Sequence, residues 1–179
     1  MKRPNRFLSA GALVIAYAFS AITFSAQEAS KEQKINPSEL SAAVRDALRT
    51  VCPNCEIAKA TREVENGVTI YDIEFRTGQG ELDLAEDGSV IERETVVPLT
   101  EIPPAALAAI KKAGGKITQI VKDEVRAELK DGNIIKLDTP KYLYEADLAK
   151  GNQVAEIQVS ADGQVIEAPR WHTRRGKGK

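Results

Sequence analysis

The 179-residue sequence is poor in the side chains that most often carry catalysis and metal binding, with one His, two Cys and one Trp. Aromatic residues make up only 5% of the chain, whereas 42% of it is hydrophobic and 28% is charged. These proportions are globular, and they exclude a disordered, collagen-like or polytopic membrane protein. Because so little His and Cys is available, we expect no cofactor and no metal centre, and we predict that the protein is not an enzyme.

The formal net charge of −1 conceals an uneven distribution of charge along the chain. All 26 acidic residues lie within residues 27–168, which contain 17 Lys and Arg, whereas residues 169–179 contain five Lys and Arg and no acid. Nucleic-acid binding requires a basic surface. An acidic body with a basic tail therefore argues against nucleic acid as the partner.

The start of the chain has the order of a secretory signal peptide. Basic residues precede residue 7, residues 7–24 contain no charge, and the small residues Ser25 and Ala26 follow. Cleavage after Ala26, or after Ser25, would release a periplasmic or secreted protein that has no membrane span in its mature form. An uncleaved membrane anchor is the alternative, because the uncharged stretch is close to the minimum length for a span.

In the rest of the chain, a pattern of one helix followed by alternating strands occurs twice. In the first copy, Asn36 and Glu39 form a capping pair before an apolar helical stripe, which must end by Pro53. Strands with a period of two residues follow, and the second helix opens at Pro103. Both copies close with Asp-Gly-x-Val-Ile-Glu, at residues 87–92 and 162–167.

These signals predict an α+β fold of two tandem repeats, each an amphipathic helix packed on an antiparallel sheet. The expected organisation is a signal peptide at residues 1–26, a flexible leader at 27–37, units at 38–97 and 98–168, and a basic tail at 169–179. The sequence leaves open whether the two units form one continuous sheet or two. It also leaves open whether residues 134–140 form a crossover strand or an exposed loop.

The repeated unit resembles the PepSY-like domain family, small exported bacterial domains related to peptidase propeptides and likened to β-lactamase inhibitory protein. The resemblance is carried by Tyr71, Ile73, Phe75, Leu82, Leu84 and residues 87–92, and by Tyr144, Ala146, Leu148, Ile157 and residues 162–167. It implies a sheet covered by helices on one face, and binding to or inhibition of exported peptidases or other envelope proteins. Its motifs are turns and core positions, so it carries over no catalytic residue.

The Cys52-Pro53-Asn54-Cys55 segment could form a disulfide or a reactive pair. A reactive first Cys needs the N-terminal end of a helix, where the dipole stabilises a thiolate, but Cys52 follows the C-terminal end of the predicted helix. No second Cys pair completes a zinc site. In an oxidising compartment we expect a structural disulfide between Cys52 and Cys55, with a redox or metal-handling role as the alternative.

Acidic residues recur on the polar side of the predicted strands. The pairs are Asp72/Glu74, Glu81/Asp83, Glu92/Glu94 and Glu145/Asp147. This alternation is typical of a solvated sheet face, and such a face would suit a basic protein surface. The predicted binding face consists of Asp72, Glu74, Arg76, Glu81, Asp83, Glu145 and Asp147.

We therefore predict a monomeric, exported protein-binding module whose partner is another exported protein. A peptidase is one candidate partner, and inhibition or modulation of it is the candidate effect. A structural envelope protein held near the surface by its basic tail is a further alternative.

Overall fold

The computed structural model describes residues 32–76 and 80–174, which form ten β-strands, two α-helices and two short 3₁₀ turns. The helical elements are η1 (Pro37–Glu39), α1 (Ala42–Val51), η2 (Leu99–Glu101) and α2 (Pro104–Ala113). The strands are β1 (Gln33–Ile35), β2 (Ile57–Glu65), β3 (Val68–Phe75), β4 (Glu81–Ala85), β5 (Val90–Val96), β6 (Lys116–Lys130), β7 (Asn133–Lys150), β8 (Gln153–Ser160), β9 (Val165–Glu167) and β10 (His172–Thr173). The signal peptide predicted at residues 1–26 lies outside the described residues.

All the described strands belong to one antiparallel sheet. Strands β1 to β8 follow one another across it in chain order, and β9 and β10 both pair with β8. The prediction of two tandem repeats, each an amphipathic helix packed on an antiparallel sheet, is therefore wrong, and the open question of one sheet or two is answered by a single sheet. The two halves are joined where β5 pairs with β6, from Glu92 opposite Val125 to Val96 opposite Val121. This pairing satisfies backbone groups that two separate sheets would leave at exposed edges.

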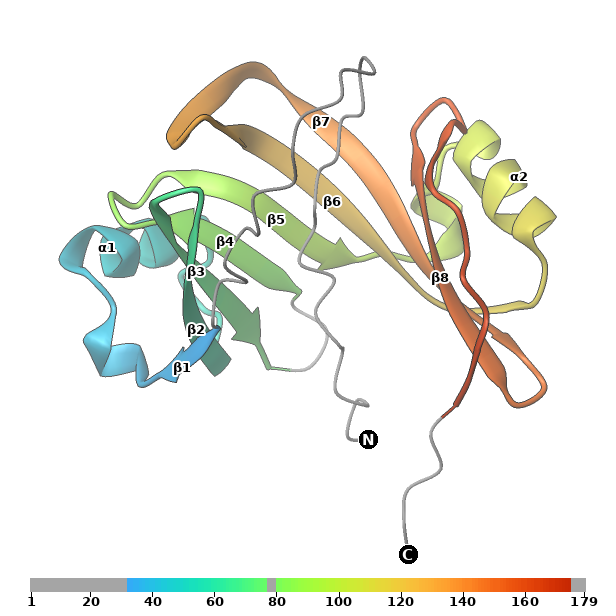
Figure 1. Cartoon of the computed structure of the whole chain (residues 1–179), viewed down its shortest axis with the longest axis horizontal. Coiled ribbons are helices and arrows are strands. Elements are labelled where there is room, and N and C mark those ends of the chain that lie inside the picture. The colour runs from blue at the N-terminus through green and yellow to red at the C-terminus, as the bar shows by residue number, and fades with distance from the viewer. Residues whose placement is uncertain (1–31, 77–79, 175–179) are drawn as a thin grey trace, which may run out of the picture.

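The two α-helices pack on the same face of the sheet, one towards each end (Figure 1). The register pairs Leu82 of β4 with Arg93 of β5, and Arg93 with Glu124 of β6. These three residues therefore lie on one side of the sheet, which is the side that faces the helices in both halves. The first core contains Ile35, Leu40, Val44, Leu48, Ala60, Tyr71, Ile73, Phe75, Leu82 and Leu84. The second contains Ile102, Ala106, Ile110, Ile120, Tyr144, Ala146, Leu148, Ile157 and Val159. Neither described helix is long and apolar enough to cross a membrane.

The first helix begins later than its capping signal indicates. Asn36 and Glu39 do form the predicted capping box, in which the backbone N–H of Asn36 donates a hydrogen bond to Glu39 Oε2 at 2.6 Å. However, this box precedes η1 rather than α1. A second cap begins α1, because the Ser41 hydroxyl accepts a hydrogen bond from the Val44 amide at 3.1 Å.

Three segments expected to be irregular or left open extend the sheet instead. The predicted flexible leader contains β1, whose Ile35 is buried in the first core. Residues 134–140 lie within β7, in a long hairpin with β6. In the predicted basic tail, Trp171 packs against the second core and the next two residues form β10. In the leader and the tail, one apolar side chain brings a short polar stretch onto the sheet, because burying that side chain is favourable.

Candidate functional site

The sheet face opposite the helices carries two rows of carboxylates that run across the strands. In the first row, Asp72, Asp83 and Glu92 are register neighbours on β3, β4 and β5. In the second row, Glu74, Glu81, Glu94 and Asp123 are register neighbours on β3, β4, β5 and β6. Directly opposed side chains in an antiparallel sheet have Cβ atoms about 5 Å apart. We call these seven residues the acidic strip.

This arrangement arises because successive side chains along a strand point to opposite faces of the sheet. On β3, Tyr71, Ile73 and Phe75 are buried in the first core, so the residues between them must point to the other face. The same holds on β4, where Leu82 and Leu84 enter that core. The acidic strip is therefore the reverse side of the strands that carry the first core, extended onto β5 and β6.

Asp72 lies at one end of the acidic strip, where Thr61 of β2 contacts one of its oxygens. The Thr61 hydroxyl donates to Asp72 Oδ2 at 3.3 Å, whereas Oδ1 is buried with no hydrogen-bond partner in the described part of the chain. Burial raises the pKa of Asp72 to about 6, and the charge of Glu81 acts in the same direction. Lys59 and the Thr61 hydrogen bond act in the opposite direction.

Asp123 lies at the other end of the acidic strip and is only 1% exposed. Gln158 of β8 donates from Nε2 to Asp123 Oδ2 at 3.3 Å. Its Oδ1 is also buried, and within residues 32–76 and 80–174 it has no hydrogen-bond partner. Burial raises the pKa of Asp123 well above its usual value, and the nearby charges of Glu92, Glu94 and Glu145 raise it further.

The carboxyl groups at the centre of the acidic strip also have raised pKa values. Burial raises the pKa of Asp83 well above its usual value, and nearby carboxylates, Asp72 first among them, add to this effect. The pKa of Glu92 is raised by burial. These carboxyl groups therefore keep protons at pH values at which an exposed Asp or Glu is ionised. On β2, Lys59 stands opposite Glu74 in register, and its ammonium lies 2.7 Å from Glu32 Oε1.

An apolar cluster adjoins the acidic strip on the same strands. Ile70 precedes Asp72 by two residues on β3, and Ala85 follows Asp83 by two residues on β4. Both are buried together with Ile91. Val68, Leu129 and Ile134 pack against this cluster, the last two from the far end of the β6–β7 hairpin. The acidic strip is thus bordered by apolar side chains at one edge.

The structure brings together four residues of the predicted binding face, places Glu145 beside them, and separates Arg76 and Asp147 from them. Asp72, Glu74, Glu81 and Asp83 form the β3 and β4 part of the acidic strip. Arg76 follows the end of β3, and its Nε lies 3.2 Å from Glu56 Oε2 at an exposed position.

The remaining two predicted residues lie on β7. Glu145 adjoins the acidic strip, because its charge contributes to the raised pKa of Asp123. Asp147 lies further along β7, opposite Glu156 of β8.

The predicted face omits three members of the acidic strip. The alternation of Glu92 and Glu94 is visible in the sequence, and the Asp87-Gly88 turn indicates that β5 adjoins β4, but no local signal shows that β5 also adjoins β6. Asp123 stands between Val121 and Val125, so its strand resembles a core strand. The register of β5 with β6 is what places Asp123 beside Glu94.

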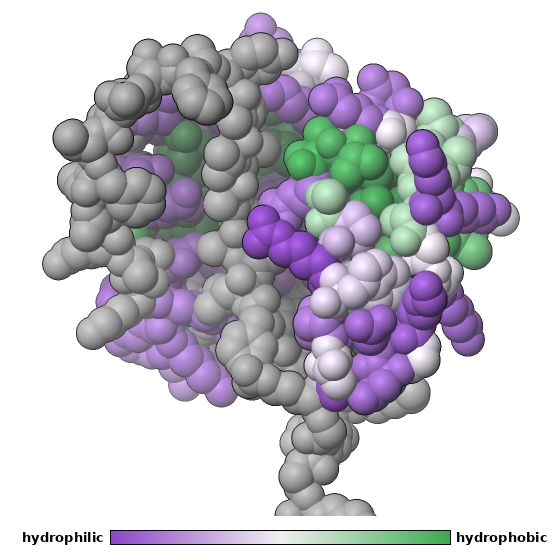
Figure 2. All heavy atoms as spheres, turned by 45° about the vertical axis from the view of Figure 1, so that its right-hand side comes forward, coloured by the Kyte–Doolittle hydropathy of each residue, from purple (hydrophilic) through white to green (hydrophobic). Residues whose placement is uncertain are grey.

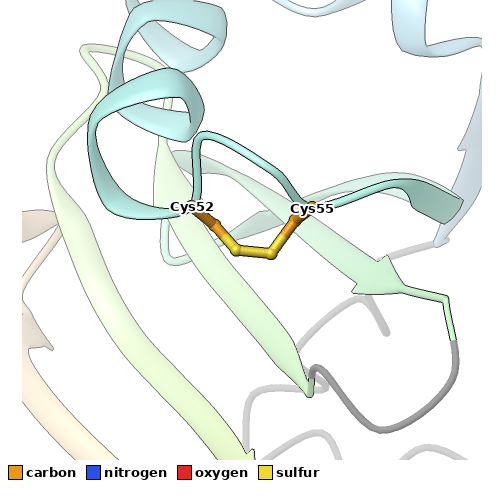
Figure 3. Close-up of a disulfide and its surroundings, with 2 residues drawn as sticks. All are labelled: Cys52 and Cys55. Carbon is orange, nitrogen blue, oxygen red and sulfur yellow. A yellow bond between two sulfur atoms is a disulfide. The ribbon is translucent and has the colours of Figure 1, made fainter.

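A disulfide joins Cys52 and Cys55 at the junction between α1 and β2 (Figure 3). Cys52 is the C-cap of α1, the two Cα atoms are 5.3 Å apart, and both side chains pack against the first core. The C-terminal end of a helix disfavours a thiolate, so this position does not activate Cys52. In the described ranges, 32–76 and 80–174, no group of three His, Cys, Asp or Glu side chains is placed to hold a metal ion.

Some apolar surface is exposed on the side of the molecule that carries α2, among hydrophilic side chains (Figure 2). Across the described residues, the large exposed hydrophobic side chains are Val64, Leu99, Ile135, Tyr142, Val165 and Ile166. They come from β2, η2, β7 and β9, and scattered apolar side chains are normal on a soluble surface. The acidic strip is therefore the stronger candidate site.

No protein-family model and no curated protein matches this chain. Its arrangement has a likeness to three crystal structures of Bacteroides proteins. A protein of Bacteroides eggerthii with a suggested periplasmic location is 14% identical, with a TM-score of 0.49 over 74% of this chain and 87% of that one. A DUF2874 family protein of Bacteroides uniformis is 13% identical, with a TM-score of 0.49 over 74% and 88%. A BLIP-like protein of Bacteroides fragilis is 18% identical, with a TM-score of 0.46 over 78% and 90%.

Proposed function

We propose that this chain is an exported, non-enzymatic protein-binding module that recognises a basic surface of its partner through the acidic strip. The observation that carries the proposal is the register of the seven carboxylates across four neighbouring strands. Like charges directly opposite each other destabilise a sheet, so this arrangement costs the free protein stability. A basic partner surface would offset that cost and gain specificity from charge complementarity.

Two features support export. The order of residues 1–26 is that of a secretory signal peptide. The disulfide between Cys52 and Cys55 supports folding in an oxidising compartment, because such bonds are rare in reducing ones. The proposed location is therefore the periplasm or the extracellular medium.

The resemblance to PepSY-like domains supports a more specific partner. That family is related to peptidase propeptides, so an exported peptidase is the first candidate, and inhibition of its activity is the candidate effect. A peptidase with a basic surface beside its active site would fit the charge of the acidic strip.

The test compares what three forms of the tagged protein capture from the native envelope and secreted fractions. The strip variant carries Asp72→Asn, Asp83→Asn and Glu92→Gln. The matched control, Glu101→Gln with Asp138→Asn and Glu167→Gln, removes the same number of carboxyl groups from exposed positions outside the strip. We expect mass spectrometry to find one protein that the wild type and the control retain and the strip variant loses. Equal retention by all three forms would contradict the proposal.

A further inference from the structure

Two buried carboxylate oxygens mark the ends of the acidic strip. Asp72 Oδ1 on β3 and Asp123 Oδ1 on β6 are both buried, and neither has a hydrogen-bond partner among the described residues. Buried polar atoms in native proteins are nearly always paired, and an unpaired one costs stability. Each oxygen therefore needs a proton or an external donor.

A neighbouring strand holds the second oxygen of each Asp. Thr61 contacts Asp72 Oδ2 from β2, and Asp83 on β4 is the register neighbour of Asp72 on the other side. Gln158 of β8 contacts Asp123 Oδ2, and Glu94 on β5 is the register neighbour of Asp123 within the strip. The two unpartnered oxygens thus belong to the residues at the two ends of the acidic strip. Three strand spacings separate β3 from β6, which is about 14 Å.

Burial and the crowding of like charges favour protonated carboxyl groups in this strip. Among the described residues, the charged and titratable groups around it are Glu32, Lys59 on β2, Asp72 and Glu74 on β3, Glu81 and Asp83 on β4, Glu92 and Glu94 on β5, Asp123 on β6, and Glu145 on β7. Nine of these ten groups are acids. The raised pKa values of Asp72, Asp83 and Asp123 are the response to that crowding and to burial.

We infer that the acidic strip receives a row of Lys or Arg side chains from one extended segment of the partner, which lie across the strip between Asp72 and Asp123. This inference rests on the proposed function and specifies the chemistry of the partner. In an extended segment, alternate side chains lie on one side, and five residues place three of them over about 13 Å. That length matches the distance from β3 to β6. The flexible stems of Lys and Arg reach into a half-buried site while packing against the adjoining apolar cluster.

Release of protons from the carboxyl groups makes this binding depend on pH. An ammonium or guanidinium stabilises the ionised carboxylate, so binding releases protons, and the affinity rises with pH until the carboxyl groups of the free protein are ionised. For each proton released, the association constant increases about tenfold per pH unit. We expect proton release at pH 6, because the pKa of Asp72 is about 6 and burial raises the pKa values of Asp83 and Asp123 in the same direction.

The test is isothermal titration calorimetry of the full protein with an acetylated, amidated peptide of four Lys-Ser repeats. Titrations at pH 6 in two buffers of different ionisation enthalpy give the number of protons released. We expect one peptide per protein, measurable proton release, and about tenfold weaker binding at pH 5 than at pH 7. Asp72→Asn should release fewer protons and bind at least fivefold more weakly, whereas Asp138→Asn should behave like the wild type.

Three results would overturn the inference. One is binding without proton release, and another is an equal effect of Asp72→Asn and Asp138→Asn. The third is equal affinity for spermine, which would show that the acidic strip takes small polyamines rather than a peptide segment. The capture experiment remains a separate test. If a partner depends on the acidic strip but the Lys-Ser peptide does not bind, the proposed function stands and this inference fails.

Discussion

The Asp72→Asn substitution is expected to stabilise the protein at neutral and alkaline pH, although it removes a charge from a buried contact. In the folded chain the pKa of Asp72 is raised from 3.8 to about 6, so the folded state binds this proton more tightly than the unfolded state does. The stability that this group contributes is therefore present at low pH and is lost as the pH rises through about 6. Asn carries no charge at any pH and keeps an oxygen that can accept the Thr61 hydrogen bond.

The magnitude follows from the two pKa values. A difference between 3.8 and about 6, at about 1.4 kcal/mol for each unit, gives about 3 kcal/mol at pH 8. Because Asp72 is partly exposed, solvent screening reduces this value, and we expect a gain in unfolding free energy of about 1–2 kcal/mol. At pH 4 the folded chain holds Asp72 protonated, so the substitution should change stability by less than about 0.5 kcal/mol.

Urea unfolding followed by Trp171 fluorescence at pH 4 and pH 8 measures both values. Asp138→Asn serves as the control, because Asp138 is exposed and lies outside the acidic strip. It should change stability little at either pH. If Asp72→Asn destabilises the protein at pH 8, or changes its stability equally at both pH values, then burial and charge crowding at the acidic strip are not what raises this pKa.

Three further predictions concern the scaffold. Gly88→Ala should lower the melting temperature by several degrees, because Gly88 has φ +81° and a Cβ there would lie 2.7 Å from a backbone carbonyl oxygen of α1. Gly151→Ala is its control, since nothing lies within 4 Å of the added atom, and an equal loss in both variants would contradict this reasoning. Replacing Cys52 and Cys55 with Ser should cost about 1–2 kcal/mol of unfolding free energy because the closed loop is short. The same double variant should leave partner capture unchanged, and loss of capture with an intact fold would instead favour the redox or metal-handling role. Trp171→Ala should cost about 2–4 kcal/mol and speed amide hydrogen exchange in the N-terminal residues of β8, which pair with β10. Unchanged exchange there would show that Trp171 does not anchor β10.

The elements that the sequence predicts well are those with strong local signals. The second helix begins at Pro104 and ends before Gly114, as its flanking residues indicate. The alternation from Tyr71 to Phe75 correctly predicts a strand with one polar face. Each of these signals depends on residues that lie within a few positions of one another in the chain.

The elements that the sequence misses depend on contacts between distant residues. β2 carries few large apolar side chains, so its alternation is weak, and it is held by β1 and β3 on its two sides. The short strands β1 and β10 exist because Ile35 and Trp171 pack against the two cores. The single sheet itself depends on the pairing of β5 with β6, across the 3₁₀ turn and helix that separate them.

In the candidate site, too, local signals predict some residues and contacts between distant residues determine the others. Local alternation is sufficient to predict that Asp72, Glu74, Glu81 and Asp83 share a face. It does not reveal that Asp123 completes the second row, because a register between strands is a long-range property. The sequence also suggests a solvated face, whereas burial raises the pKa of Asp83 and Asp123 well above their usual value.

Carbodiimide cross-linking of the captured complex is the measurement that tests the central claim most directly. This reagent activates carboxyl groups and joins them to Lys amines in direct contact, so it reports both the face that binds and the chemistry of the partner. The account predicts cross-links from Glu74, Glu81 or Glu94 of the acidic strip to Lys residues of the partner. Cross-links confined to acids elsewhere, such as Asp46 of α1 or Glu101 of η2, would place the interface on the helical face and contradict the account.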